Sequence, residues 1–163
     1  MTDDFKHDFR LSLQAEGYFS DALERALMAE PVYIGEDIRF AQDYGGGVFA
    51  ILSVFDEDAR PHFFSLSLRL PDGVMTPNLV EEARQLFNQL VAMDDAARAI
   101  PRKHDENEEL EGVILLSDRD IAVLQYTSNL WNTEWGVHFL RDESGAYRLL
   151  GIPDYRNPGT FIT

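Results

Sequence analysis

The sequence WNTEWGVHFLRDESGAYRLLGI, residues Trp131–Ile152, is the strongest indicator of how this chain folds. Two runs rich in aromatic and aliphatic residues flank a short charged segment that contains Gly145. This pattern is typical of a β-hairpin whose strands are joined by a loop of several residues. We therefore expect a hairpin here, at the centre of an antiparallel sheet with which the rest of the chain pairs.

Further strands are predicted on the N-terminal side of the hairpin. Val48–Phe55 is apolar on both faces, which indicates a central strand. Phe64–Leu70 alternates apolar with polar residues, which predicts a strand with one exposed face. Shorter strands are expected at Ile38–Ala41, Val113–Leu116 and Ile121–Tyr126.

A long helix over about residues 77–100 is the clearest helical element. Thr76 is suited to cap its N-terminus, and Pro77 suits the first helical position. Apolar residues then recur at helical spacing, which predicts one buried face along the helix. They are Leu79, Ala83, Leu86, Phe87, Leu90, Met93, Ala97 and Ile100.

The N-terminal part, about residues 3–30, is predicted to form a helical pair. Phe5, Phe9 and Leu13 recur every four residues, and a second helix is expected between Ser20 and Pro31. Residues 9–15 also alternate in the manner of a strand, so both interpretations of that segment stay open.

Together these elements predict an α+β fold with a mostly antiparallel sheet of about five to seven strands. The long helix and the N-terminal helical pair would cover the sheet. A length of 163 residues fits a single domain. In it, the sheet and long helix occupy about residues 32–152, and residues 153–163 form a tail against the surface.

The composition limits the kinds of partner. The chain has 29 acidic and 14 basic residues, a formal net charge of −15, so nucleic acid is not expected as a partner. A basic protein is permitted. There is no cysteine, which excludes thiol chemistry and disulfides. The acidic N-terminus and the lack of a long apolar run predict no signal peptide and no membrane segment, hence a cytoplasmic protein.

Few patterns indicate a reaction or a cofactor. Gly45–Gly47 is followed by a strand and lacks the lysine of a phosphate loop, so a hairpin turn is expected there. Ser117–Asp120 lies between two predicted strands and is taken as a turn. The histidines are not at metal spacing. His138 lies near Glu134 and Asp142 in sequence, and such a pair could act in acid–base catalysis. No catalytic, cofactor or metal residue is assigned.

Two groups of residues are candidates for binding a protein. One is the acidic cluster of a predicted solvated loop over residues 101–111, which could attract a basic partner and pair with arginine or lysine. Its members are Asp105, Glu106, Glu108, Glu109 and Glu111. The other group comprises aromatic residues that could anchor an interface, Trp131, Trp135 and Tyr155.

This order of elements resembles small bacterial α+β domains that serve as immunity proteins of polymorphic toxin and contact-dependent systems. The resemblance covers about Ile38 to Ile152. It rests on strands followed by the long helix, on the acidic connector, and on the closing strand Glu134–Phe139 with Gly145 and Leu149–Gly151. It implies a cytoplasmic inhibitor that binds a cognate toxin. Two alternatives remain, a small enzyme or ligand-binding domain using His138 with a carboxylate, and a secretion chaperone or adaptor.

Overall fold

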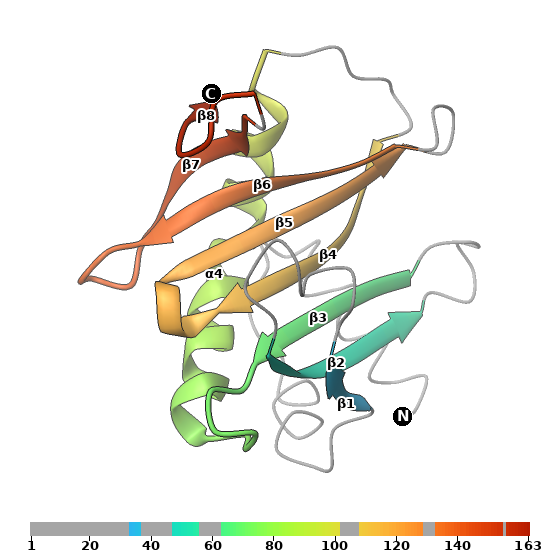
Figure 1. The fold of residues 1–163 in the computed structure, drawn as a ribbon, viewed down its shortest axis with the longest axis vertical. Coiled ribbons are helices and arrows are strands. Elements are labelled where there is room, and N and C mark those ends of the chain that lie inside the picture. Colours follow the sequence, from blue (N-terminus) through green and yellow to red (C-terminus); the bar gives the residue numbers. More distant parts are fainter. Residues whose placement is uncertain (1–32, 37–46, 56–62, 102–107, 129–132, 155) are drawn as a thin grey trace.

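A computed structural model describes residues 33–36, 47–55, 63–101, 108–128, 133–154 and 156–163. These residues form eight strands, one long helix and one short 3-10 helix (Figure 1). In chain order they are β1 Tyr33–Glu36, β2 Val48–Phe55, β3 Phe63–Arg69, α4 Pro77–Arg98, β4 Glu108–Leu116, η1 Ser117–Arg119, β5 Ile121–Ser128, β6 Thr133–Arg141, β7 Tyr147–Pro153 and β8 Phe161–Ile162. The α+β class predicted from the sequence is confirmed.

The strands lie side by side in the order in which they occur in the chain. Neighbours are antiparallel, except that β3 and β4 run parallel and α4 forms the connection between them. This connection is needed because parallel neighbours cannot be joined by a tight turn. The β7–β8 ladder is short and pairs Ile152 with Ile162 and Pro153 with Phe161. The sheet is therefore mostly antiparallel, as expected, with β8 as a small addition beyond seven strands.

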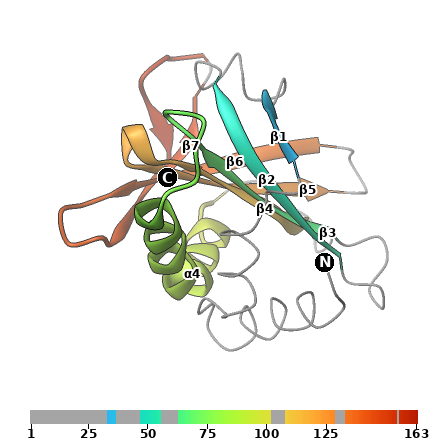
Figure 2. The same ribbon diagram turned by 90° about the horizontal axis from the view of Figure 1, so that it is seen from below.

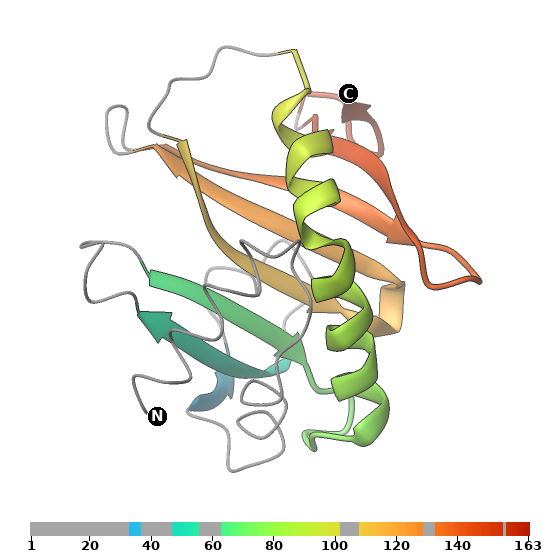
Figure 3. The same ribbon diagram turned by 180° about the vertical axis from the view of Figure 1, so that it is seen from behind.

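The helix α4 lies across one face of the sheet (Figures 2 and 3). Thr76 caps it, since its Oγ1 accepts a hydrogen bond from Leu79 N at 3.3 Å, and Pro77 follows at the start. All eight apolar positions predicted for the helix are buried, and Val80 joins them. They pack on sheet residues such as Leu66, Val113 and Leu124.

The other face of the sheet has its own buried group. Phe49, Ile114, Leu116 and Val123 form a second cluster, and each is 0 % exposed. Ile114 and Val123 are cross-strand neighbours at the centre of the sheet. The middle strands β4 and β5 are thus buried on both faces. The central position expected for Val48–Phe55 is wrong, because β2 lies next to β1, the first strand in the order.

The hairpin expected at Trp131–Ile152 is present as β6 and β7, but its expected central position is wrong. β4 and β5 lie in the middle of the strand order, and β6 and β7 lie toward one edge. The aromatic residues of the hairpin reflect packing against the helix, since Trp135 and Tyr147 both join the cluster beneath α4.

The strand predicted at Phe64–Leu70 is β3, but its expected exposed face is buried. Ser67 is 3 % and Arg69 is 6 % exposed. Arg69 lies 5.5 Å over the ring of Phe49, and its Nη1 is 3.3 Å from an oxygen of Asp118. A polar side chain can thus be buried on an interior strand, because a carboxylate and an aromatic face receive the guanidinium.

Several expectations fall outside the described residues. These are the N-terminal helical pair over residues 3–30, the strand Ile38–Ala41 and most of the loop at 101–107. The strand β1, at Tyr33–Glu36, was not predicted. It pairs with β2 in antiparallel orientation, with Glu36 opposite Val48. The turn expected at Gly45–Gly47 falls outside the described residues except for Gly47.

Candidate functional site

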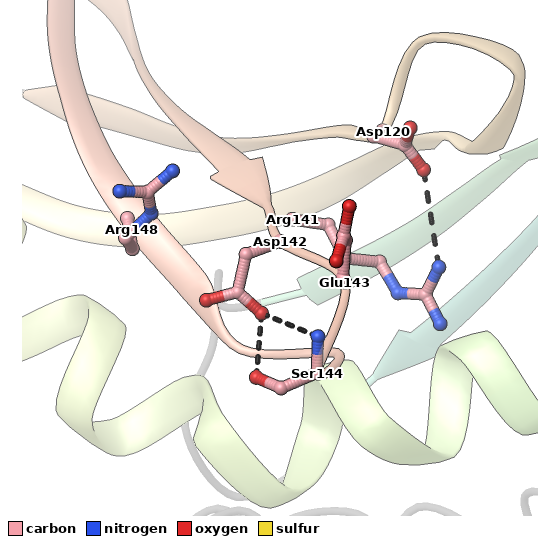
Figure 4. A pocket seen from close by; sticks show the side chains of 6 residues that line it. All are labelled: Asp120, Arg141, Asp142, Glu143, Ser144 and Arg148. Atoms are coloured by element: carbon pink, nitrogen blue, oxygen red, sulfur yellow. Dashed lines mark hydrogen bonds and ion pairs between the residues drawn. The ribbon is translucent and has the colours of Figure 1, made fainter.

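An open cleft of about 680 Å³ lies beside the turn that joins β6 to β7 (Figure 4). The residues that line it are Asp120, Arg141, Asp142, Glu143, Ser144 and Arg148. Three carboxylates and two guanidinium groups therefore face one hollow. They come from the turn before β5, from the end of β6, from the β6–β7 turn, and from β7.

The β6–β7 turn is held by Asp142. Its Oδ1 accepts hydrogen bonds from Ser144 N at 2.8 Å, from Ser144 Oγ at 2.5 Å and from Ala146 N at 3.1 Å. The Ser144 hydroxyl lowers the pKa of Asp142 most, and the backbone amides act in the same direction. Gly145 completes the turn with a φ of +87°, which glycine adopts without strain. Asp142 is therefore an ionised residue whose main role is to shape the turn.

Arg141 forms one wall of the cleft and connects it to α4. Its Nη2 donates to Gln85 Oε1 at 3.0 Å, and its Nη1 lies 3.8 Å from Asp120 Oδ1. Its main-chain N–H also donates to Asp120 O at 2.7 Å. The Nε atom of Arg141 is buried without a hydrogen-bond partner. The arginine is thus positioned by the helix and by the turn before β5, and part of its bonding capacity is unused.

Two further titratable groups lie on the helix side of Arg141. Burial raises the pKa of Glu82. The charge of Arg141 acts to lower this pKa, and the charge of Asp120 acts to raise it. Burial also raises the pKa of Tyr147, whose hydroxyl has no hydrogen-bond partner. Tyr147 is the cross-strand neighbour of Arg141. Glu82 and Tyr147 therefore bring two titratable groups to the margin of the apolar core under α4.

The cleft is suited to ionic contacts on an open surface. Asp120 has a 60 % exposed side chain, and Glu143 is also exposed. Carboxylates in such a position can accept hydrogen bonds from an ammonium or guanidinium group. Among the residues that the structure describes, no group of three or more histidine, aspartate or glutamate side chains is arranged to hold a metal ion.

The acidic cluster predicted from the sequence is only partly described. Asp105 and Glu106 lie outside the described residues, whereas Glu108, Glu109 and Glu111 belong to β4. The expectation that this whole stretch is a loop is therefore wrong from Glu108 onward. These residues pair with the far end of β5 from Asp120, since Glu108 is opposite Ser128. The two acidic groups therefore lie near opposite ends of β5, a strand that can be followed in Figure 1.

Of the aromatic candidates, Trp131 and Tyr155 lie outside the described residues. Trp135 is half-buried and stacks on Tyr126, with ring centroids 4.2 Å apart and an angle of 8° between the rings. Arg98 lies over the ring of Tyr126 at 5.3 Å. Trp135 is therefore a packing residue between β6, β5 and α4, with part of its surface left open.

His138 is buried at 8 % exposure in the middle of β6. Its ring lies 5.7 Å from that of Phe161 in β8. Glu134 and Asp142 are each four residues away along an extended chain, about 13 Å at about 3.3 Å per residue. This spacing separates the backbone of His138 from that of both residues, and the Asp142 carboxylate holds the β6–β7 turn.

The cleft residues were missed in the sequence because they belong to separate elements. Ser117–Asp120 was correctly expected as a turn, yet its closeness to Arg141 follows only from the pairing of Ile121 with Leu140. A usable signal was the row of polar residues at helical spacing beside the apolar face of α4, namely Glu82, Gln85 and Gln89.

No helix among the described residues is both long and apolar enough to cross a membrane. Comparison with known proteins leaves the family open, because no protein-family model, no curated protein and no solved structure matches this chain.

Proposed function

We propose that this protein is a non-enzymatic protein-binding module, an acidic immunity protein that neutralises a cognate bacterial toxin by covering its basic or active surface. The observation that carries the proposal is the net charge of −15, with exposed carboxylates gathered in an open cleft. Opposite charge on a partner speeds association and fixes orientation. A toxin whose active groove is basic is such a partner.

The cleft at the β6–β7 turn supports this proposal in its chemistry. Asp120 and Glu143 are exposed, and the turn that carries Glu143 is fixed by the bonds of Asp142. Carboxylates on a rigid turn lose little conformational entropy when they pair with arginine or lysine. In the proposed mechanism these groups orient the toxin, and the body of the sheet then blocks its active surface.

The second acidic group offers a different docking end. Glu108 and Glu109 begin β4, next to the acidic residues Asp105 and Glu106 in sequence. Either end of the sheet could therefore meet the basic partner, and one experiment can separate them.

The test uses the protein encoded by the adjacent gene, purified as an inactive variant for binding and as active enzyme for inhibition. Three matched pairs of amide substitutions each remove two negative charges. The cleft pair is Asp120→Asn with Glu143→Gln, the β4 pair is Glu108→Gln with Glu109→Gln, and the control pair is Asp72→Asn with Asp95→Asn. Asparagine suits position 120, where φ is +54°.

We expect either the cleft pair or the β4 pair to weaken binding at least about tenfold, about 1.4 kcal/mol, while the control pair has little effect. Equal losses in all three pairs would mean that net charge alone matters, which contradicts a defined acidic docking end. No binding and no inhibition by the unmodified protein would overturn the proposed function for that partner.

A further inference from the structure

The outer edge of β7 is the side that faces away from β6. Asp142 N donates to Ala146 O at 2.9 Å, so the main-chain groups of Ala146 point toward β6. Main-chain groups alternate in direction along an antiparallel pair. Those of Tyr147, opposite Arg141, and of Leu149, opposite Phe139, therefore point away from β6. An uncovered row of such groups is a template for an added strand.

One glutamine of α4 occupies the beginning of this edge. Gln89 Oε1 accepts from Tyr147 N at 2.9 Å, and Gln89 Nε2 donates to Gly145 O at 2.8 Å. A residue of a neighbouring parallel strand makes the same two bonds, to an N–H and a carbonyl that are two residues apart. Nε2 also donates to Gln85 O at 3.0 Å, which holds the amide in place. The side chain thus substitutes for a strand.

The short strand β8 occupies the other end of the same edge. It pairs with Ile152 and Pro153. Gly151 allows this close approach, because a Cβ at that position would lie 2.2 Å from Ile162 O, and its φ is +119°. The position of β8 is therefore built into the sequence of β7. The ladder also shows that this edge accepts an antiparallel strand.

We infer that Gln89 and β8 together form an edge cap that prevents strand addition to β7, and that the strand they exclude is β7 of a second copy of this chain. Gln89 takes the N–H of Tyr147, so the outward main-chain groups between the two caps are the carbonyl of Tyr147 and the N–H and carbonyl of Leu149. Self-pairing of β7 about a two-fold axis would need a longer continuous row, because strands usually pair over about five or six residues.

The experiment opens each part of the cap separately. Gln89→Met keeps the length of the side chain and removes both strand-like hydrogen bonds. Gln85→Met is the matched control, since Gln85 lies one turn earlier and its side chain bonds Arg141 but no main-chain group of β7. Gly151→Val, made alone and together with Gln89→Met, displaces β8 from β7, because its side chain would clash with Ile162. Far-UV circular dichroism and thermal melting verify that each variant is folded.

Sedimentation velocity from low micromolar to near-millimolar concentration measures association. We expect Gln89→Met to dimerise at least about tenfold more tightly than the unmodified protein, about 1.4 kcal/mol, and the double variant more tightly still. Gln85→Met should match the unmodified protein. Exchange of the Leu149 amide should slow as the concentration of the variant rises, which places the contact at β7.

Association of Gln89→Met and the double variant no tighter than that of the unmodified protein would overturn the inference. Association that leaves Leu149 exchange unchanged with concentration would also overturn it, since the copies would then meet elsewhere. If the double variant does not fold, Gln89→Met alone decides between these outcomes.

Discussion

At the scale of single residues, two buried tyrosines beneath α4 give a direct contrast in hydrogen bonding. Tyr126 OH donates to Asp94 Oδ1 at 2.6 Å, whereas the hydroxyl of Tyr147 is buried without a partner. A hydroxyl that has given up water stabilises the fold only if the protein replaces the lost bond. The two residues should therefore respond differently to the same substitution.

We expect Tyr126→Phe to lower the free energy of unfolding by about 1–2 kcal/mol, since a hydrogen bond to a charged group contributes about 1.5–3 kcal/mol and Asp94 is partly exposed. Tyr147→Phe should change it by less than about 0.5 kcal/mol, or stabilise the protein, because no bond is lost. Urea unfolding of both variants measures the difference. Equal losses would contradict the assigned bonding.

Glu82 gives a pH-dependent prediction. Burial raises its folded-state pKa above the ordinary value of 4.5. The resulting stabilisation is present below about pH 4.5 and is lost as the pH rises through the folded-state pKa. Ionised Glu82 therefore disfavours the fold at neutral pH, and Glu82→Gln removes this cost.

Glu82→Gln should accordingly raise Tm at pH 7 by about 1–3 °C, since about 1 kcal/mol shifts Tm by about 2–4 °C in a chain of this size. The gain should shrink as the pH approaches 4.5. Glu81→Gln is the control, because the Glu81 side chain is 59 % exposed. Differential scanning calorimetry against pH checks this, and a lower Tm for Glu82→Gln at pH 7 would contradict it.

At the scale of elements, Gly112 tests how closely β3 and β4 must pack, and Gly73, in the turn after β3, serves as the comparison. A Cβ at Gly112 would lie 2.6 Å from Ser65 O, so Gly112→Ala would force these paired strands apart. At Gly73 nothing lies within 4 Å, and only its φ of +73° disfavours alanine. We expect a loss of more than about 2 kcal/mol for Gly112→Ala and of about 1–2 kcal/mol for Gly73→Ala. Chemical denaturation measures both, and the reverse order would refute this account.

The elements with a strong local signal were predictable from the sequence. The cap at Thr76 and the apolar period fixed α4, and the two apolar faces of Val48–Phe55 matched β2. The period of apolar residues indicates which side chains are buried in an apolar core. It does not predict that Arg69 is buried beside Asp118, because that contact depends on the position of η1. It also could not rank strands by position in the sheet, which is why the hairpin was expected at the centre.

The cleft was not predictable for the same reason. Its turn could be recognised from Gly145 and the charged residues around it. The approach of Asp120 to Arg141 depends on the pairing of β5 with β6, and that of Gln85 depends on how α4 crosses the sheet. Neither the pairing of β5 with β6 nor the crossing of α4 over the sheet produces a periodic pattern of residues in the sequence.

At the scale of the whole molecule, the charge of −15 predicts a dependence on salt. Like charges on a compact chain repel one another, and salt screens them. Between about 0.01 M and about 0.1 M NaCl the screening length falls from about 30 to about 10 Å, so Tm should rise over this range. The rise should be smaller at a pH closer to the pI of about 4.5. Scanning calorimetry decides, and a Tm that falls with added NaCl would contradict self-repulsion as the dominant effect.

The parallel contact of β3 with β4 has a consequence for how the chain reaches its final form. Within β1–β3 and within β4–β8, each strand pairs with the next strand in the chain, so these ladders can form outward from the short connections between the strands. Ser65 and Gly112 meet only after the whole of α4 has been spanned. Ring closure of that length is entropically costly, and contacts distant in sequence slow folding. The strands β1–β3 and the strands β4–β8 can therefore form early as two separate groups connected by α4. The pairing of β3 with β4, which joins the two groups, is then the rate-limiting step of folding.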